Sequence, residues 1–254
     1  MKQKIYYAML LVIIGLLPGS LSSAQGPDVK ALIRGNLNYM RGKTSVSTVD
    51  MTIHRPQWQR VSRIKVWTRG EKESLFILMA PPKDRGNGTL KLGKKMWTFN
   101  PKVNRVIKLP PSMMARAWMG SDFSNNDLAK TDSVIEDYEH EITGSESQDG
   151  KTVYLIKSIP KPDAAVIWGM LTFKIREDLI PVEEIFYDED LEPVKILEFS
   201  RLEMLGGRLL PRVMKMYRVD RPDEYTLVEY VSIAFDVDLK DRRFTLAALK
   251  NPGR

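Results

Sequence analysis

Residues 46–68, VSTVDMTIHRPQWQRVSRIKVWT, switch between apolar and polar side chains at almost every position. Val49, Met51 and Ile53 alternate with polar residues, and the same alternation returns around Ile64. A period of two places successive side chains on opposite faces of a β-strand. The stretch therefore predicts two antiparallel strands, each with one face toward a core.

Short runs of the same kind fill most of the remaining chain. They are Ser74 to Ala80, Leu90 to Asn100, Arg105 to Leu109, Val134 to Thr143, Thr152 to Ile159, Trp168 to Arg176, Pro181 to Tyr187, Pro193 to Leu202, Leu209 to Tyr217 and Tyr225 to Asp236. Turn residues such as Asn100-Pro101 and Gly206-Gly207 separate them. Short turns join antiparallel strands, because parallel strands need long crossovers.

So many strands in one sheet tend to curl. The predicted fold is mainly β, a strongly curved antiparallel sheet or half-open, incomplete β-barrel covered by a few α-helices. Residues 25–254 show no linker rich in proline or serine and no internal repeat, so they are expected to form a single domain.

Residues 1–24 have the pattern of a signal peptide. Lys2 and Lys4 precede an apolar run from Ile5 to Leu17, and Ser22-Ser23-Ala24 fits the small residues of a cleavage site. The apolar run is shorter than the ~20 residues needed to cross a bilayer. We therefore expect an exported, periplasmic protein that is cleaved after about Ala24.

The composition excludes several classes of site. The 254 residues contain no cysteine, so the chain has no disulfide, no thiolate metal site and no lipid-modified cysteine. The net charge is only +7, and no dense run of lysine and arginine is interleaved with aromatic residues, so nucleic acid is not an expected partner. A hydrophobic core must hold the domain together, and its length is sufficient for one.

Two helices are expected outside the sheet. Asp28 to Arg41 places apolar residues at helical spacing, and Pro27-Asp28 is a start signal. Its apolar stripe predicts packing against the sheet. Asp241 to Leu249 is expected to form a short closing helix.

No motif for catalysis or metal binding stands out. Gly88 to Lys95 resembles a phosphate-binding loop, but Lys95 occupies the position where serine or threonine must bind magnesium. His54 and His140 lie far apart in the sequence, and no serine lies in a Gly-x-Ser-x-Gly elbow. We therefore expect no enzyme activity, no cofactor and no metal.

The segment Ser112 to Lys130, SMMARAWMGSDFSNNDLAK, differs from the strands around it. Its large apolar side chains are expected either to plug the protein's own core or to cover a cavity that a ligand can enter; they are Met113, Met114, Trp118, Met119 and Phe123. Methionine suits a variable apolar contact because its side chain is unbranched and flexible.

Several motifs resemble the LolA-like outer-membrane lipoprotein-sorting family of periplasmic carriers. The resemblance rests on Pro81-Pro82-Lys83-Asp84-Arg85-Gly86, Leu90, Trp97, Pro101, Arg105, Ile107, Met119-Gly120-Ser121-Asp122-Phe123-Ser124 with Asp127-Leu128, Leu179-Ile180-Pro181, Phe186-Tyr187, Lys195, Gly206-Gly207 and Leu210-Pro211. It implies an incomplete barrel of about eleven strands, with helices as a lid over an apolar cavity for acyl chains. In the best-known carriers an arginine on an early strand latches the lid, and Arg55, Arg60 and Arg63 all compete for that role here.

On this reading the five apolar side chains of the segment are the lid. The cavity wall is predicted from strand alternation to include Ile64, Val66, Leu75, Ile77, Met96 and Thr98. Hinges or helix caps of the lid are predicted at Gly120, Ser121, Asp122 and Asp127.

The predicted function is that of a monomeric carrier that binds the acyl chains of a lipoprotein or other lipid and shuttles them toward the outer membrane. An inner-membrane exporter of the resistance-nodulation-division type and an outer-membrane acceptor are the partners this implies. The alternative is a lipid-binding sensor or accessory subunit docked on an inner-membrane transporter or regulator. Stable co-purification with a membrane protein would distinguish the alternative.

Overall fold

The computed structural model describes residues 26–129 and 133–252, so the predicted signal peptide and Lys130 lie outside the described residues. The strands are β1 (Thr44–Arg55), β2 (Trp58–Arg69), β3 (Glu73–Ala80), β4 (Gly88–Leu92), β5 (Lys95–Asn100), β6 (Arg105–Lys108), β7 (Tyr138–Gln148), β8 (Lys151–Pro160), β9 (Met170–Arg176), β10 (Pro181–Tyr187), β11 (Pro193–Leu205), β12 (Arg208–Arg218) and β13 (Arg221–Phe235). The helices are α1 (Val29–Arg41), α2 (Asn125–Ala129), α3 (Ser133–Asp137) and α4 (Leu246–Lys250). Short 3-10 helices are Pro82–Asp84, Pro101–Val103, Pro111–Met113, Trp118–Gly120 and Asp241–Phe244.

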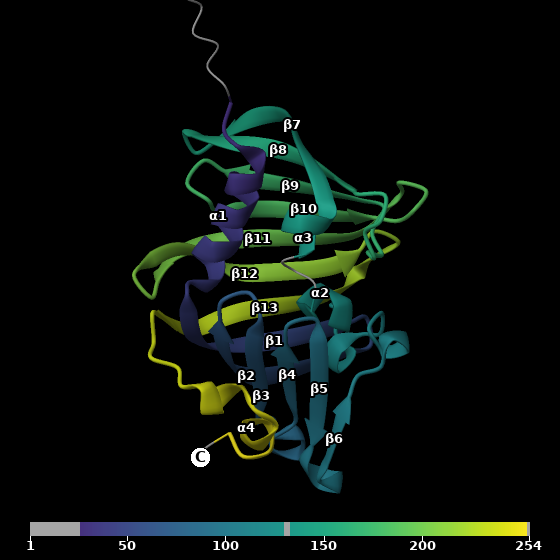
Figure 1. The fold of residues 1–254 in the computed structure, drawn as a ribbon, viewed down its shortest axis with the longest axis vertical. Coiled ribbons are helices and arrows are strands. Elements are labelled where there is room, and N and C mark those ends of the chain that lie inside the picture. The colour runs from purple at the N-terminus through teal and green to yellow at the C-terminus, as the bar shows by residue number, and fades with distance from the viewer. Residues whose placement is uncertain (1–25, 130–132, 253–254) are drawn as a thin grey trace, which may run out of the picture.

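The thirteen strands of the described residues form one antiparallel sheet (Figure 1). Their order is β6-β5-β4-β3-β2-β1-β13-β12-β11-β10-β9-β8-β7. Strands β6 and β7 are the two edges, and the curved sheet does not close into a barrel. The predicted fold class is therefore confirmed, with more strands than the resemblance implied.

The hairpin predicted from residues 46–68 forms as expected. β1 and β2 pair in unbroken register from Thr44 opposite Arg69 to Arg55 opposite Trp58. Two residues, Pro56-Gln57, make the turn between them. Paired residues lie on the same face, so Val49 and Ile64 share one face of the sheet.

Two expected strands were wrong in their limits. Leu90 to Asn100 is not one strand, because Gly93 takes a φ of +58° and turns the chain between β4 and β5. Val134 to Thr143 begins with helix α3 instead of a strand. Val134 and Ile135 are both buried, and consecutive residues of a strand would point to opposite faces.

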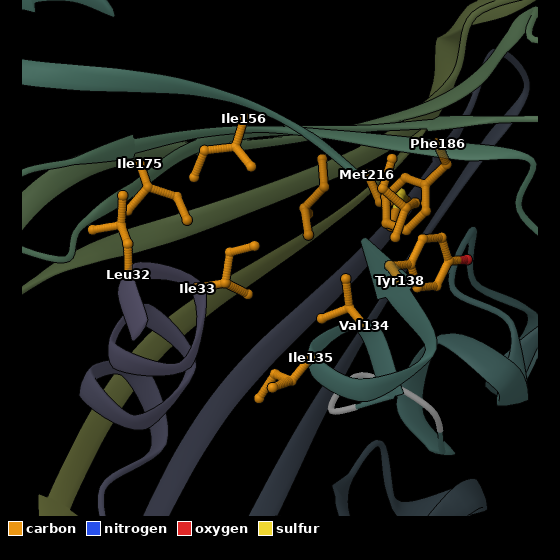
Figure 2. Packing of buried hydrophobic residues seen from close by; sticks show 11 residues of the cluster. Leu32, Ile33, Val134, Ile135, Tyr138, Ile156, Ile175, Phe186 and Met216 are labelled. Atoms are coloured by element: carbon orange, nitrogen blue, oxygen red, sulfur yellow. The ribbon is translucent and has the colours of Figure 1, made fainter. Parts of the chain in front are cut away.

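Helix α1 confirms the amphipathic pattern and its start signal. The Asp28 carboxylate accepts hydrogen bonds from the amides of Lys30 and Ala31, at 2.9 and 3.1 Å. Leu32 and Ile33 are buried against the sheet. In Figure 2 these two side chains and those of α3 point toward residues of the sheet strands. Helices α1 and α3 thus cover the same face of the sheet (Figure 1).

The opposite face is covered near β3 and β4 by the C-terminal segment. There Phe244 and Leu249 pack against Leu75, Ile77 and other buried residues of these strands. The closing helix predicted near the C-terminus is therefore present as α4, after a 3-10 turn. Among the described residues no helix is long and apolar enough to cross a membrane.

Candidate functional site: an apolar cavity under the Ser112–Lys130 segment

A cavity of about 430 Å³ lies against the face of the sheet that α1, α3 and the Ser112–Lys130 segment cover. This volume is within the range of pockets that hold small ligands. Most of the lining is apolar and comes from both halves of the sheet. It includes Ile33 and Leu37 of α1, Val49, Met51, Ile64, Val66 and Phe76 of β1 to β3, Leu171, Phe173, Phe186, Leu197, Phe199, Met214, Met216, Val228 and Tyr230 of β9 to β13, and Trp118 and Phe123 of the segment.

Strand pairing explains why these residues meet. Val66 of β2 lies opposite Phe76 of β3, so both side chains project to the cavity face. On the other half of the sheet, Phe199 of β11 lies opposite Met214 of β12 in the same way. The ladder therefore places one apolar row from each strand along a continuous wall.

Residues 112–129, the described part of the segment with the predicted lid side chains, pack against this wall. Trp118 is 6% exposed, and its ring makes an edge contact with the ring of Phe76, with 5.3 Å between centroids. Its indole N–H donates to the Thr89 hydroxyl at 3.1 Å. Met113, Met114 and Met119 are partly buried against the cluster around β1 and β2, whereas Phe123 packs against the cluster under α1. The segment thus bridges the two apolar clusters of this face.

Of the three candidate arginines, Arg55 makes the side-chain contact with the segment. Its guanidinium donates two hydrogen bonds to the Asp122 carboxylate, at 3.2 and 3.0 Å, and the side chains are only 17% and 8% exposed. The Thr226 hydroxyl donates to the same carboxylate at 2.6 Å. Arg60 donates to the backbone carbonyl of Met119, and Arg63 pairs with Asp50, away from the segment.

Of the predicted hinge and cap residues, Gly120 and Ser121 lie in a turn of the segment, and Asp127 lies at the start of helix α2. Met119 and Gly120 both have positive φ, at +51° and +76°, and Ser121 donates its hydroxyl to the Trp118 carbonyl at 2.7 Å. Asp127 accepts from the amide of Ser124 at 2.7 Å, and its own amide donates to the Ser124 hydroxyl at 3.1 Å, at the start of α2. Asp127 is therefore a helix cap.

Asp122 is not a cap, contrary to one of its two predicted roles. Its carboxylate is engaged by Arg55 and Thr226, which belong to β1 and β13. It ties the segment to the sheet instead of satisfying amides of a helix.

The wall residues predicted on β2 and those predicted on β3 lie on opposite faces of the sheet. Ile64 and Val66 line the cavity. Leu75 and Ile77 lie on the opposite face, against Leu249 and Phe244. The reason is the register: Phe76, not Leu75, is the partner of Val66.

Met96 and Thr98 of β5 do not line the cavity either. Met96 lies opposite Lys91, a cavity residue, and is buried in the same cluster as Trp118. Thr98 lies opposite Thr89, to which Trp118 donates its hydrogen bond. Both residues share the cavity face, but they lie where the cavity does not reach.

No sequence pattern predicted the acidic residue Glu184 in this wall. Glu184 of β10 lies opposite Phe173 and Leu197, both of which line the cavity, and it lines the cavity itself. Burial, followed by the negative charge of Asp127, raises the pKa of Glu184 to about 8. Close by in the fold, Lys195 and Asp127 form an ion pair of 3.0 Å, with the Lys195 ammonium 5.3 Å from the Trp168 ring centre.

The second half of the wall was also missed. The sequence patterns placed α1 and strands β9 to β13 in the fold but assigned them no contact with a ligand. A further lining segment, Val166 to Trp168, lies in the loop before β9 and has no periodic pattern. Strand alternation on β9, as in Leu171 and Phe173, is the signal from which part of this half could have been inferred.

Comparisons with known proteins identify a matching family and solved structures with the same fold. A family model described as that of an uncharacterized protein matches residues 70–251. A search of the curated proteins found no match. Among solved structures, a DUF1329 family protein from Desulfovibrio piger is 25% identical with a TM-score of 0.76, over 87% of this chain and 98% of that chain.

Two other solved structures share the fold. A protein domain named for outer-membrane lipoprotein sorting, from Vibrio parahaemolyticus, is 20% identical with a TM-score of 0.73, over 87% of this chain and 97% of that chain. A LolA superfamily protein from Nitrosomonas europaea is 19% identical with a TM-score of 0.70, over 86% of this chain and 97% of that chain. The resemblance stated from the sequence motifs is thereby confirmed at the level of the fold.

Proposed function

This chain belongs to the DUF1329-like family and has the LolA-like fold, and on that premise we propose that it carries an acylated lipoprotein or lipid in its apolar cavity. One observation supports the proposal above all. The cavity is roofed by a segment whose own apolar side chains, such as Trp118 and Phe123, form part of the lining.

The cost of moving an acyl chain through water explains the need for such a cavity. A palmitoyl chain has about 15 methylenes, and at ~0.8 kcal/mol for each one its exposure costs on the order of 12 kcal/mol. A protein that binds the chain must offset most of this cost and still release it. An apolar pocket without a strong polar trap meets both conditions.

The segment provides a way to limit the affinity. In the empty form its apolar side chains occupy apolar surroundings, with Trp118 buried and Met113, Met114 and Met119 partly buried. A ligand must displace some of these contacts, so the net binding energy is smaller than the burial of the ligand alone. Plugging the core and covering a ligand are then two states of the same lid.

Arg55 and Asp122 are suited to latch the closed state. They join β1 to the lid by a two-fold hydrogen-bonded ion pair with little exposure to water. These side-chain contacts can break and reform without disturbing the sheet, because the strands are held together by backbone hydrogen bonds. We assign the latch role to Arg55, with Arg60 holding the neighbouring backbone at Met119.

The exported character of the sequence and the fold of the lipoprotein-sorting proteins support a periplasmic place of action. There the carrier would receive its cargo at the inner membrane and deliver it toward the outer membrane. An inner-membrane exporter and an outer-membrane acceptor are part of the same proposal.

A reversible covalent lock on the lid tests this function. The Asp122 and Thr226 side chains already touch, and the chain has no cysteine, so Asp122→Cys combined with Thr226→Cys introduces one defined disulfide. We expect the oxidised variant to take up no fluorescent palmitoyl peptide from vesicles, and the reduced variant to take it up. The two single variants are the controls.

Equal uptake by the oxidised and reduced double variants would show that the lid does not gate the cavity. Absence of uptake by the unmodified protein would contradict the carrier function itself. Mass spectrometry of the disulfide-linked peptides confirms that the lock has formed.

A further inference from the structure

The cavity wall is mostly apolar but includes the carboxyl groups of Glu71, Asp127, Glu183 and Glu184. Glu184 lies on β10 between cavity residues of β9 and β11, and two positions further along the strand Phe186 also lines the cavity. In the part of the chain that the structure describes, no hydrogen bond or ion pair engages the Glu184 carboxyl group. Its neighbour Glu183 differs, because it pairs with Lys174 at 3.6 Å.

The surroundings of Glu184 favour the neutral acid. Asp127, the charged group of α2 that acts on it, is negative and already paired with Lys195 at 3.0 Å. Burial in an apolar wall disfavours a carboxylate that has no counter-ion. The result is a pKa of about 8, so the acid is mostly protonated at neutral pH.

A protonated carboxyl group has one O–H donor, and Glu184 is half-buried where it lines the cavity. No hydrogen bond joins this group to another described residue, so a ligand in the cavity can supply the acceptor. In an acylated molecule the acceptor that accompanies an alkyl chain is the carbonyl oxygen of its ester or amide. A cationic group would instead require the ionised acid.

We propose that Glu184 is the polar anchor of the cavity and donates a hydrogen bond to the ester or amide carbonyl of an acylated ligand, whose alkyl chain lies along the apolar wall. This inference rests on the proposed carrier function and makes its ligand class specific. The anchor fixes the depth to which the acyl chain enters. It also selects acyl chains over plain hydrocarbons and alkyl ethers.

A matched pair of ligands isolates the anchor. 1-Palmitoylglycerol and 1-O-hexadecylglycerol share the head group and the chain length, but only the first has a carbonyl. We expect the unmodified protein to prefer the ester by about five- to tenfold, the value of one hydrogen bond to a buried donor. Displacement of a fluorescent apolar dye from the cavity gives both dissociation constants.

Three variants complete the experiment. Glu184→Leu should reduce the ester preference to less than twofold and still bind the ether. Glu184→Gln keeps a donor and should retain the preference. Glu198→Leu removes a carboxyl group from the neighbouring strand β11, outside the cavity lining, and should behave as the unmodified protein.

The two sources of an acyl carbonyl are distinguished by a further ligand. An N-palmitoyl peptide carries an amide, as an acylated protein does, and 1-palmitoylglycerol carries an ester, as a glycerolipid does. The ligand whose affinity falls most in Glu184→Leu identifies the source.

The outcomes separate the two proposals. An ester preference that survives in Glu184→Leu, no preference in the unmodified protein, or tighter binding of hexadecylamine than of the ester overturns the anchor and leaves the carrier function standing. Failure of the unmodified protein to bind either the ester or the ether overturns the carrier function, and the anchor with it.

Discussion

The guanidinium of Arg55 and the carboxylate of Asp122 meet in two hydrogen bonds, of 3.2 and 3.0 Å, at the tip of the first hairpin. The two residues are 67 positions apart in the chain, and their pair joins the lid to the sheet. With side-chain exposures of 17% and 8%, the pair is well shielded from water. Removing one partner of such a shielded pair leaves the other charge uncompensated, which costs more than breaking an exposed ion pair.

Asp122→Asn should therefore loosen the lid. The change keeps the shape of the side chain and removes its charge, and we expect a loss of about 1–3 kcal/mol in the stability of the closed lid. The backbone amide hydrogens of residues 118–124 should exchange with solvent faster. A palmitoyl ligand should bind more tightly, because it then displaces a less stable closed lid.

Arg63→Gln is the matched control for this prediction. Arg63 also forms a two-fold pair, with Asp50 at 2.7 Å, but its side chain is 50% exposed and does not touch the lid. Hydrogen exchange in the lid should be unchanged in this variant. Unchanged exchange in Asp122→Asn as well would refute the latch.

Charging the underside of the lid should abolish ligand uptake. In Trp118→Glu a carboxylate replaces a ring that is 6% exposed and packs against Phe76. Lipid that co-purifies with the protein is measured by mass spectrometry. Met204→Glu is the control, because Met204 is 68% exposed and does not line the cavity. Equal lipid content in the two variants would show that Trp118 does not cover the ligand.

Stability should fall as the pH rises from about 5 to about 9 because of Glu184. Its pKa is about 8 in the folded protein and 4.5 as the ordinary value, so the folded state binds more protons between these values. Glu184 therefore contributes its full stabilisation below its pKa in the unfolded chain. This contribution is lost as the pH rises through its pKa in the folded protein. The titratable groups that interact with it are Asp127 of α2, which is itself paired with Lys195 of β11, and Tyr138 of β7.

Glu184→Gln should flatten this profile. Each unit of pKa difference corresponds to about 1.4 kcal/mol, so up to about 4 kcal/mol of pH-dependent stability should disappear. Urea unfolding at several pH values gives the comparison, with Glu198→Gln as the control in the neighbouring strand. A profile that keeps its slope in Glu184→Gln would assign the pH dependence to another group.

Substitutions on the two faces of the sheet near β3 should have different effects. Leu75→Ala leaves a cavity beside Leu249 and should cost about 2–5 kcal/mol of stability, with no change in the ligand affinity of the folded protein. Val66→Trp places a larger side chain into the ligand cavity and should weaken ligand binding. Thermal unfolding and dye displacement measure the two effects separately. The reverse result would place the cavity on the α4 side.

The alternating strand pattern was sufficient to predict the sheet and the first hairpin, and helical spacing was sufficient to predict helix α1. The strand pattern has a limit, however. It failed for the wall at β3, because Leu75, Phe76, Ile77 and Leu78 are all apolar and have no polar face to give a direction. Both faces of β3 are covered, one by the lid and one by α4. Only the pairing of Phe76 with Val66 shows which side chains face the cavity.

The latch and the anchor could not be predicted for a related reason. Arg55, Arg60 and Arg63 lie within one hairpin; the partners of Arg55 and Arg60 come from the distant lid segment, whereas Arg63 pairs with Asp50 of the same hairpin. Glu183 and Glu184 are adjacent and chemically identical, and the sequence does not show that Glu183 pairs with Lys174 whereas Glu184 lies between Phe173 and Leu197 in the cavity wall. In both cases the tertiary arrangement, not the local pattern, determines the role of the side chain.

The single continuous sheet has a mechanical consequence. β1 and β13 pair along most of their length, with one irregularity between Thr48 and Val49, and they connect the two halves of the wall. A sheet changes its twist and coiling with little loss of backbone hydrogen bonds, and bulges are the places where it bends. The cavity can therefore change its width without any strand separating from its neighbour, as the proposed carrier would need for ligands of different size.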